Sequence, residues 1–268
     1  MYDRSADDAR PGITPGVYQM YAGRTAQTNA AFLLPHLQPG MSVLDVGCGL
    51  GSITMGLAEC VAPGRVVGVD LDGDAVVKAR ALAEERGLTN VEFRTGSVYE
   101  LPFADGAFDA AFAHMVLMHL ADPHRAVAEV FRVLKPGGVF GCAERAEQGD
   151  IRANTNETIE RAWGLFMRWQ EARGSDLRIG PALPRVLREA GFDVVDARAA
   201  YARDETVRTL REWFTTFFGE PSIVDRMVER GWADEGEIEG VRVAIEEFTS
   251  HADTVWSLAR CEVVGRKR

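Results

Sequence analysis

The stretch VLDVGCGLG, residues 43–51, joins a short apolar run to a helical pattern through a turn rich in glycine. A short apolar run that ends at glycines is typical of a buried strand, and apolar residues recur at helical spacing from Ile53 to Cys60. Glycine carries no side chain and adopts left-handed conformations at little cost, so the backbone of this turn can approach a ligand closely. A turn of this kind between a strand and a helix predicts a site for a nucleotide-like molecule.

The alternation of strand and helix continues after the turn. Runs at 66–69, 91–95, 108–113 and 139–143 have the composition of strands, as do the residues near Val194 and at 261–264. Helical patterns separate them, and turn signals such as Gly87 and Gly191 end these helices. Strands that alternate with helices form βαβ units, so the sequence predicts an α/β fold with a parallel sheet.

Two helical segments, at about 147–180 and 202–256, interrupt this alternation. We interpret them as cap insertions in a single domain, whose core covers about 20–145 and 181–200 with a terminal strand at 259–266. Their aromatic residues either line an apolar pocket over the reacting group or pack on one another. These residues are Trp163, Phe166, Trp169, Trp213, Phe214, Phe217 and Phe218.

The composition describes a globular chain and excludes several other classes of protein. Of 268 residues, 46% are hydrophobic and 26% charged, and no apolar run approaches the roughly 20 residues of a transmembrane helix. A net charge of -10 disfavours nucleic acid and anionic lipid as partners. The polar segment from Met1 to Arg10 lacks the features of a secretory signal, so we expect a cytoplasmic location.

The turn and one later acid leave two cofactor classes open. The dinucleotide fingerprint G-x-G-x-x-G requires a third glycine at a position that Ser52 occupies, which weakens the NAD interpretation. Asp70 follows the turn by about 20 residues, where a carboxylate can accept hydrogen bonds from both hydroxyls of a ribose. A ribose is expected whether the ligand is a dinucleotide or another nucleotide-like molecule. An NAD-linked oxidoreductase stays as an alternative function.

An ordered set of motifs resembles one known family. VLDVGCGLG is followed by Val69-Asp70, by LPF at 101–103, by Phe108-Asp109 and by RVLKPGG at 132–138. This set closely resembles the class I S-adenosylmethionine-dependent methyltransferases of the UbiE-like group, most strongly over about residues 20–145. The resemblance implies a Rossmann-like, doubly wound sheet, mostly parallel with an antiparallel last strand, and S-adenosylmethionine as the cofactor.

The resemblance also assigns cofactor contacts along the chain. The glycines would pass beneath the methionine part, Asp70 would hold the ribose, and Arg24 would meet the methionine carboxylate. The family often has aspartate facing the adenine, where this sequence has Ser97. The implied cofactor residues are Tyr21, Arg24, Asp45, Gly47, Gly49, Gly51, Asp70, Leu71, Ser97, Val98 and His114.

Methyl transfer is an in-line displacement, so the protein chiefly has to align the acceptor and exclude water, and no metal is required. A hydroxyl acceptor gains from a base, and histidine has a suitable pKa. The candidates are His114, at the end of the fourth strand, and His119, in the segment where the family has L-H-H. Glu144 is a third candidate, placed to orient one of these imidazoles.

The acceptor is expected to be a small apolar or aromatic metabolite. Sequences like Asp-Pro-Pro-Tyr, which mark enzymes that methylate bases and amides, are absent after the fourth strand. In the alternative, the same fold with a structural cofactor acts as a non-methylating cyclase or binding module. We expect no nucleic-acid or membrane partner and take a homodimer as the assembly to test.

Overall fold

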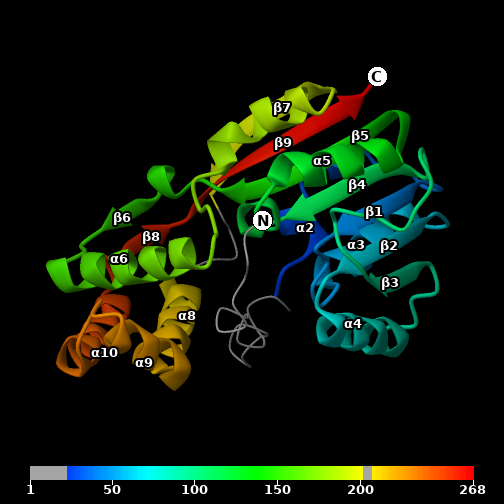
Figure 1. Ribbon diagram of the computed structural model, residues 1–268. Coiled ribbons are helices and arrows are strands. Elements are labelled where there is room, and N and C mark those ends of the chain that lie inside the picture. Colours follow the sequence, from blue (N-terminus) through cyan, green and yellow to red (C-terminus); the bar gives the residue numbers. More distant parts are fainter. Residues whose placement is uncertain (1–22, 202–206) are drawn as a thin grey trace.

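The computed structural model describes residues 23–201 and 207–268, and its core is a seven-stranded sheet (Figure 1). The strand order is β3-β2-β1-β4-β5-β9-β7. The strands are β1 (Ser42–Val46), β2 (Arg65–Asp70), β3 (Val91–Thr95), β4 (Phe108–His114), β5 (Leu134–Arg145), β7 (Phe192–Tyr201) and β9 (Ala259–Lys267). The first five pair in parallel, whereas β9 runs antiparallel to β5 and β7. The predicted mostly parallel sheet with an antiparallel last strand is confirmed.

Helices cover both faces of the sheet. One face carries α2 (Ala26–Asn29), α3 (Ser52–Val61) and α4 (Gly73–Glu85), and the other carries α5 (Pro123–Val133) and α7 (Leu183–Glu189). Successive side chains of a strand point to opposite faces. Phe112 of β4 therefore packs in the same cluster as α3, and its neighbour Ala111 packs in the cluster that contains α5. Both faces of the central strands are buried, as expected for a doubly wound sheet.

The helix starts explain which acids are structural. The side chain of Asp72 accepts hydrogen bonds from the backbone of Asp74 and Ala75 and so caps α4. Asp122 accepts from the backbone of Arg125 and caps α5. Each carboxylate satisfies amide groups that the first turn of a helix leaves without partners. Asp70, which precedes α4, is therefore not needed as its cap.

The segments predicted as insertions contain α6 (Glu157–Ala172), α8 (Val207–Gly219), α9 (Pro221–Glu229) and α10 (Glu235–Ser250). We call these four helices the cap, and they pack around an apolar cluster of their own. Figure 1 shows the cap beside the sheet, at the end away from β3. An antiparallel ribbon of β6 (Ile151–Ala153) and β8 (Val255–Ser257) connects the cap to β5 and β9. This ribbon was not predicted, because strands of three residues are too short to show strand alternation.

A buried ion pair fixes the junction between sheet and cap. Arg145, at the end of β5, donates from both terminal nitrogens to Asp150, at 2.9 and 2.7 Å, and also donates to the carbonyl of Ala259. Asp150 in turn accepts from the backbone of Ala259 at 2.7 Å. Paired, planar contacts of this kind hold their geometry well. The ribbon therefore leaves the sheet at a defined angle.

Three further features concern the class of protein. Within residues 23–201 and 207–268, no helix has the length and apolar character needed to cross a bilayer. All four cysteines are free thiols, and Cys142 is buried. The described residues also contain no group of histidine, cysteine and acidic side chains arranged to hold a metal ion.

Candidate functional site

The candidate site lies at the carboxyl edge of the parallel strands. From β1 the chain moves to β2 and β3 on one side of the sheet, and then to β4 on the other side. Such a reversal of strand order leaves a crevice above the neighbouring strand ends, which is where ligands bind in open α/β sheets. The glycine turn follows β1, Asp70 ends β2 and His114 ends β4. The topology thus brings three of the predicted positions to one edge.

The three glycines of the turn have different roles. All are left-handed, with φ of 70°, 51° and 73° at Gly47, Gly49 and Gly51. A methyl group on Gly47 would collide with Val116, and one on Gly51 would collide with Phe93, so those two positions serve the packing of the protein. A methyl group on Gly49 would meet no protein atom within 4 Å. Gly49 therefore provides the open surface on which a ligand can lie.

Asp70 holds the turn in place. Its Oδ2 accepts a hydrogen bond from the backbone of Gly49 at 2.8 Å, and its Oδ1 accepts from the backbone of Asp72 at 2.9 Å. A carboxylate has about four acceptor positions, so capacity remains for two hydroxyl groups. Leu71, the next residue, is 70% exposed and presents an apolar surface beside this carboxylate. The pair suits a ribose joined to a flat apolar ring.

Asp45 lies beneath the turn rather than at its surface. It is 3% exposed, and the hydroxyl of Thr54 donates to its Oδ2 at 2.6 Å. Burial raises the pKa of Asp45 to about 7, and the nearby charge of Asp70 acts in the same direction, while the Thr54 bond opposes it. Burial and the same two carboxylates raise the pKa of Cys48 as well, so this thiol stays protonated.

The remaining predicted cofactor residues lie around this edge or outside the described ranges. Ser97 and Val98 follow β3, both half-buried, and the hydroxyl of Ser97 accepts from the backbone of Tyr99 at 3.2 Å. Arg24 lines a hollow of 170 Å³ beside the start of α3. Tyr21 lies outside the described residues. The adenine and carboxylate contacts predicted for these residues remain predictions.

The segment after β4 has an unusual backbone. Met115 is left-handed, with φ of 57°, which is uncommon for a residue other than glycine. Its amide donates to the carbonyl of Ala143 at 2.9 Å, so the neighbouring strand holds it there. Strained residues of this kind cluster at functional sites, where the surrounding structure maintains them. The chain then enters a short 3-10 turn, Leu117–His119.

Glu144 fixes this segment instead of orienting an imidazole. Its Oε1 accepts from the amides of Val116 and Leu117 at 2.9 and 2.7 Å, and its Oε2 accepts from the amide of Met118 at 3.2 Å. The expectation that Glu144 forms a carboxylate–histidine pair is therefore corrected, because its acceptors face backbone amides. Glu144 is fully buried, and burial raises its pKa to about 7 although the three amides act in the opposite direction.

His114 is buried at the end of β4. Its ring stacks on Phe112, with centroids 6.3 Å apart, and its Nε2 lies 3.4 Å from the side-chain nitrogen of Asn29. Burial lowers the pKa of His114 well below its ordinary value, and the charges of Arg24 and Arg260 lower it further. The ring is therefore neutral at pH 7.

His119 lies at the end of the 3-10 turn and is half-buried. Its Nδ1 is 2.9 Å from the hydroxyl of Ser175, which belongs to the loop after α6. The same loop donates the amide of Asp176 to the carbonyl of Met118 at 2.7 Å. The loop from the cap thus positions His119, and the sequence offered no signal for Ser175, which is 56 residues away.

The aromatic residues of the cap are used in packing. Trp163 and Phe214 are 4% and 1% exposed, and Phe214 contacts five neighbouring rings with centroids 5.4 to 6.2 Å apart. Phe166 contacts Trp213 edge to face at 4.2 Å. Contacts between aromatic edges and faces are favourable in themselves. Of the two roles considered for these rings, the structure supports packing on one another.

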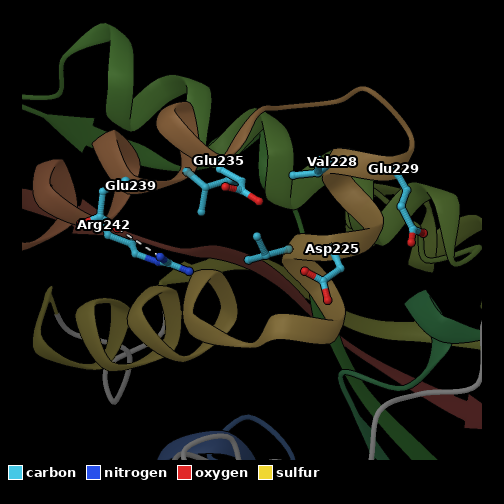
Figure 2. A pocket seen from close by; sticks show the side chains of 8 residues that line it. Asp225, Val228, Glu229, Glu235, Glu239 and Arg242 are labelled. Atoms are coloured by element: carbon cyan, nitrogen blue, oxygen red, sulfur yellow. Dashed lines mark hydrogen bonds and ion pairs between the residues drawn. The ribbon is translucent and has the colours of Figure 1, made fainter.

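A groove lies in the cap. It has a volume of 520 Å³, lies between α9 and α10, and its apolar floor is bordered by Asp225, Glu229, Glu235, Glu239 and Arg242 (Figure 2). Figure 1 shows these helices at the end of the molecule away from β1 to β3. Its lining comes only from the cap, and none of the predicted site residues contributes to it. This groove is therefore separate from the candidate site.

Comparison with known proteins agrees with this geometry. A family model described as a methyltransferase domain matches residues 37–174, about half of the chain. The chain is 28% identical over 278 residues to the protein named "Probable methyltransferase ltbC" from Aspergillus luteorubrus, and 96% of each chain is covered. It is 30% identical to a demethylmenaquinone methyltransferase from Lactococcus lactis, over 59% of this chain and 68% of that protein.

A similar solved structure carries a different name. It is the [4+2]-cyclase SpnF, which matches with a TM-score of 0.59 and 26% identity. The match covers 90% of this chain and 77% of that chain. One fold can host unrelated activities, so the chemistry has to be argued from the residues of the site.

Proposed function

The chain belongs to the class I S-adenosylmethionine-dependent methyltransferases, and we propose that it transfers the methyl group to a small apolar or aromatic metabolite. The observation that carries the proposal is the open, left-handed Gly49, whose amide is tied to Asp70. A backbone without a side chain and a carboxylate with spare acceptors form a cradle for a nucleoside. S-adenosylmethionine supplies an activated methyl group when bound there.

The residues of this edge fit the cofactor. Asp70 has the acceptors for two ribose hydroxyls, and Leu71 offers an exposed apolar side chain for one face of the adenine. We assign the methionine end to the region of Gly49 and Arg24, where a guanidinium can pair with a carboxylate. Asp45 supports the turn from below through Thr54.

The acceptor is assigned to the segment that follows β4. Val116 and Met118 are half-buried apolar side chains in this segment, and Glu144 holds all the backbone amides from Val116 to Met118. A fixed segment aligns an acceptor with the methyl group, which is most of what an in-line displacement requires. One relative is named for a quinone acceptor, which supports a small aromatic metabolite here.

His119 is our choice of base for a hydroxyl acceptor. Its Nδ1 lies 2.9 Å from the hydroxyl of Ser175, whose oxygen can accept the proton of a neutral ring, so this contact favours the tautomer with its basic lone pair on Nε2. His114 is less suited, because burial and two arginine charges lower its pKa and a base of low pKa holds a proton weakly. We therefore assign proton removal to His119 and positioning of His119 to Ser175.

Transfer of a labelled methyl group tests the proposed function directly. The purified protein is incubated with S-adenosylmethionine labelled in the methyl group and with a panel of phenolic, quinol and aliphatic metabolites. Label in a product supports the transfer. Cofactor binding without label uptake from any acceptor would favour a cyclase or binding module, and binding of NADH in place of S-adenosylhomocysteine would favour an oxidoreductase.

The same assay tests the base. His119→Ala is expected to lower kcat by about 100-fold or more on a hydroxyl acceptor while the dissociation constant for S-adenosylhomocysteine stays unchanged. Ser175→Ala should lower kcat less and shift the acid limb of the pH profile, whereas a merely structural loss would scale the whole profile. Unchanged turnover in His119→Ala would exclude this base.

A further inference from the structure

The edge formed by β4, β5 and β9 holds buried hydrogen-bond donors that methyl transfer itself does not require. Arg260 on β9 is 3% exposed. Its Nε donates to Oε1 of Glu262 at 2.9 Å and its Nη2 donates to the carbonyl of Thr28 at 3.1 Å. Its Nη1 is buried and has no hydrogen-bond partner among the described residues. A buried charged donor without an acceptor is costly, so this atom points to an acceptor that arrives with a ligand.

His114 provides a second donor of the same kind. The amide of Thr25 donates to Oδ1 of Asn29 at 3.1 Å, which fixes the side-chain nitrogen of Asn29 toward Nε2 of His114 at 3.4 Å. Nε2 is therefore the acceptor, and the neutral ring carries its proton on Nδ1. Nδ1 is also buried, and within the described ranges it has no partner.

Both donors lie on one face and at one end of the sheet. Side chains of a strand alternate, so His114 shares its face with Phe112, and Arg260 shares its face with Val264. Phe112 and Val264 belong to the cluster on the side of α2 and α3. The strand pairing places both residues at the same end of the sheet. On β5, Ala143 pairs with His114 of β4, and Arg145, two residues later, pairs with Arg260 of β9.

Arginine side chains lie near these donors, although the whole chain carries a net charge of -10. Arg24 and Arg260 lie close enough to His114 for their charges to lower its pKa. Glu262 is the carboxylate next to Arg260, and it is shared with Arg198, whose Nε is 3.5 Å from Oε2. A carboxylate brought by a ligand would face the charge of Arg260, and attraction between opposite charges is stronger in a buried place than in water.

We infer that Arg260 and His114 form an oxyanion site, and that the metabolite methylated by this protein carries a carboxylate which accepts from Nη1 of Arg260 and Nδ1 of His114. The inference rests on the proposed function and adds the charge of the acceptor to it. The site belongs on the acceptor side, because β4 and β5 separate β9 from the strands that carry Gly49 and Asp70. The carboxylate would anchor the acceptor while its apolar body lies along the segment after β4.

The test uses benzoate as the probe and benzamide as its neutral counterpart. Both are titrated into the full-length protein saturated with S-adenosylhomocysteine, by calorimetry and by thermal unfolding. Benzoate is expected to bind at least about tenfold more tightly than benzamide, since only the carboxylate matches two charged or polarised donors. Equal binding of the two compounds, or no binding of benzoate, overturns the inference.

Variants then locate the site. Arg260→Gln is expected to weaken benzoate at least about tenfold, and His114→Phe to weaken it less, because it removes a neutral donor and keeps the ring. The matched control is Arg266→Gln, which removes a charge from the same strand at an exposed position and should leave benzoate affinity unchanged. Unweakened benzoate binding in Arg260→Gln overturns the assignment. If Arg260→Gln does not fold, the ligand pair on the natural protein and His114→Phe still decide.

Two further comparisons separate this inference from others. In one alternative, the two donors bind the methionine carboxylate of the cofactor. Benzoate would then compete with S-adenosylhomocysteine but not with 5′-methylthioadenosine, which lacks that carboxylate. This result would overturn the assignment of the donors to the acceptor. Under the inference, benzoate binds with either nucleoside present. Binding of S-adenosylhomocysteine alone reports on the proposed function, so its failure is distinguishable from failure of the benzoate test.

Discussion

The glycine turn after β1 and the aromatic cluster of the cap use their characteristic residues in opposite ways. In the turn, Gly49 faces open space and Asp70 keeps acceptors to spare. In the cap, the rings of Phe166 and Phe214 contact other rings of the same cluster. Groups that the fold leaves unsatisfied indicate a binding site, whereas groups that satisfy one another indicate a core. The comparison predicts that cofactor binding and stability will respond to different substitutions.

The largest expected effect is on the stability of the cap. Phe214→Ala removes a ring that is 1% exposed and should lower the free energy of unfolding by about 3–5 kcal/mol. The dissociation constant for S-adenosylhomocysteine, measured by calorimetry below the unfolding transition, should not change. Val243→Ala, at a position 51% exposed on α10, is the control and should have little effect on either quantity. A large loss of cofactor affinity in Phe214→Ala would place the cofactor in contact with the cap.

Gly49→Ala should act mainly on cofactor affinity rather than on stability. The methyl group enters the space assigned to the cofactor and should weaken S-adenosylhomocysteine by about 100-fold, which is close to 3 kcal/mol. Gly87→Ala is a matched control, because Gly87 is also left-handed, with φ of 67°, and its methyl group would also meet nothing within 4 Å. Both variants should lose about 1–2 kcal/mol of stability from the left-handed backbone. Equal cofactor affinity in the two variants would contradict the assignment of the turn.

Asp70→Ala should weaken the cofactor less, by about tenfold or somewhat more, since it removes hydrogen bonds to ribose and the tie to Gly49 but leaves the space open. Asp72→Ala is the comparison, because that acid caps α4. Asp72→Ala should lose about 1 kcal/mol of stability and keep its cofactor affinity. Both variants are measured by calorimetry for cofactor affinity and by denaturation for stability. Loss of affinity in Asp72→Ala and loss of stability alone in Asp70→Ala would exchange the roles of the two acids.

The last prediction concerns the dependence of stability on pH. Burial raises the pKa of Glu144 in the folded protein from 4.5 to about 7, so between these values the folded protein holds a proton that the unfolded chain has lost. This contribution to stability is complete below pH 4.5 and is lost as the pH rises through about 7. The side chain introduced by Glu144→Gln cannot titrate. This variant should therefore reduce the slope of the free energy of unfolding against pH by up to about 1.4 kcal/mol per pH unit.

Asp45, whose pKa is also raised to about 7, should keep part of that slope. Urea denaturation at several pH values between 4.5 and 8 gives the measurement, and Asp45→Asn should remove the remainder. A slope that does not change in either variant would mean that neither carboxyl group holds its proton in the folded protein.

Much of the fold could be predicted from local sequence. The strand ends and the left-handed Gly87 and Gly191 depend on interactions between residues a few positions apart. Local patterns of this kind are visible along the chain. The ribbon of β6 and β8 was not predicted, because its two short strands pair across about 100 residues and neither shows a pattern alone.

The candidate site divides in the same way. Gly49, Asp70 and Leu71 could be placed from the motif, because a turn and the end of the next strand are local and their pairing follows from the parallel sheet. The partners of Glu144 could not, since they are backbone amides of another segment. Arg260 was missed, because Glu262 and Arg266 of the same strand are also charged and no local pattern distinguishes Arg260 from them.

The sequence alone therefore determined the fold class, the family resemblance and the cofactor turn, because each is written in short-range patterns of glycine, acid and apolar residues. Only the tertiary structure decided which of those residues remain available. It showed that the aromatic rings are used up by their neighbours, that Glu144 is satisfied by amides, and that Arg260 and His114 retain buried donors. Hydrogen-bond satisfaction depends on groups brought together from distant parts of the chain, and no local pattern records it.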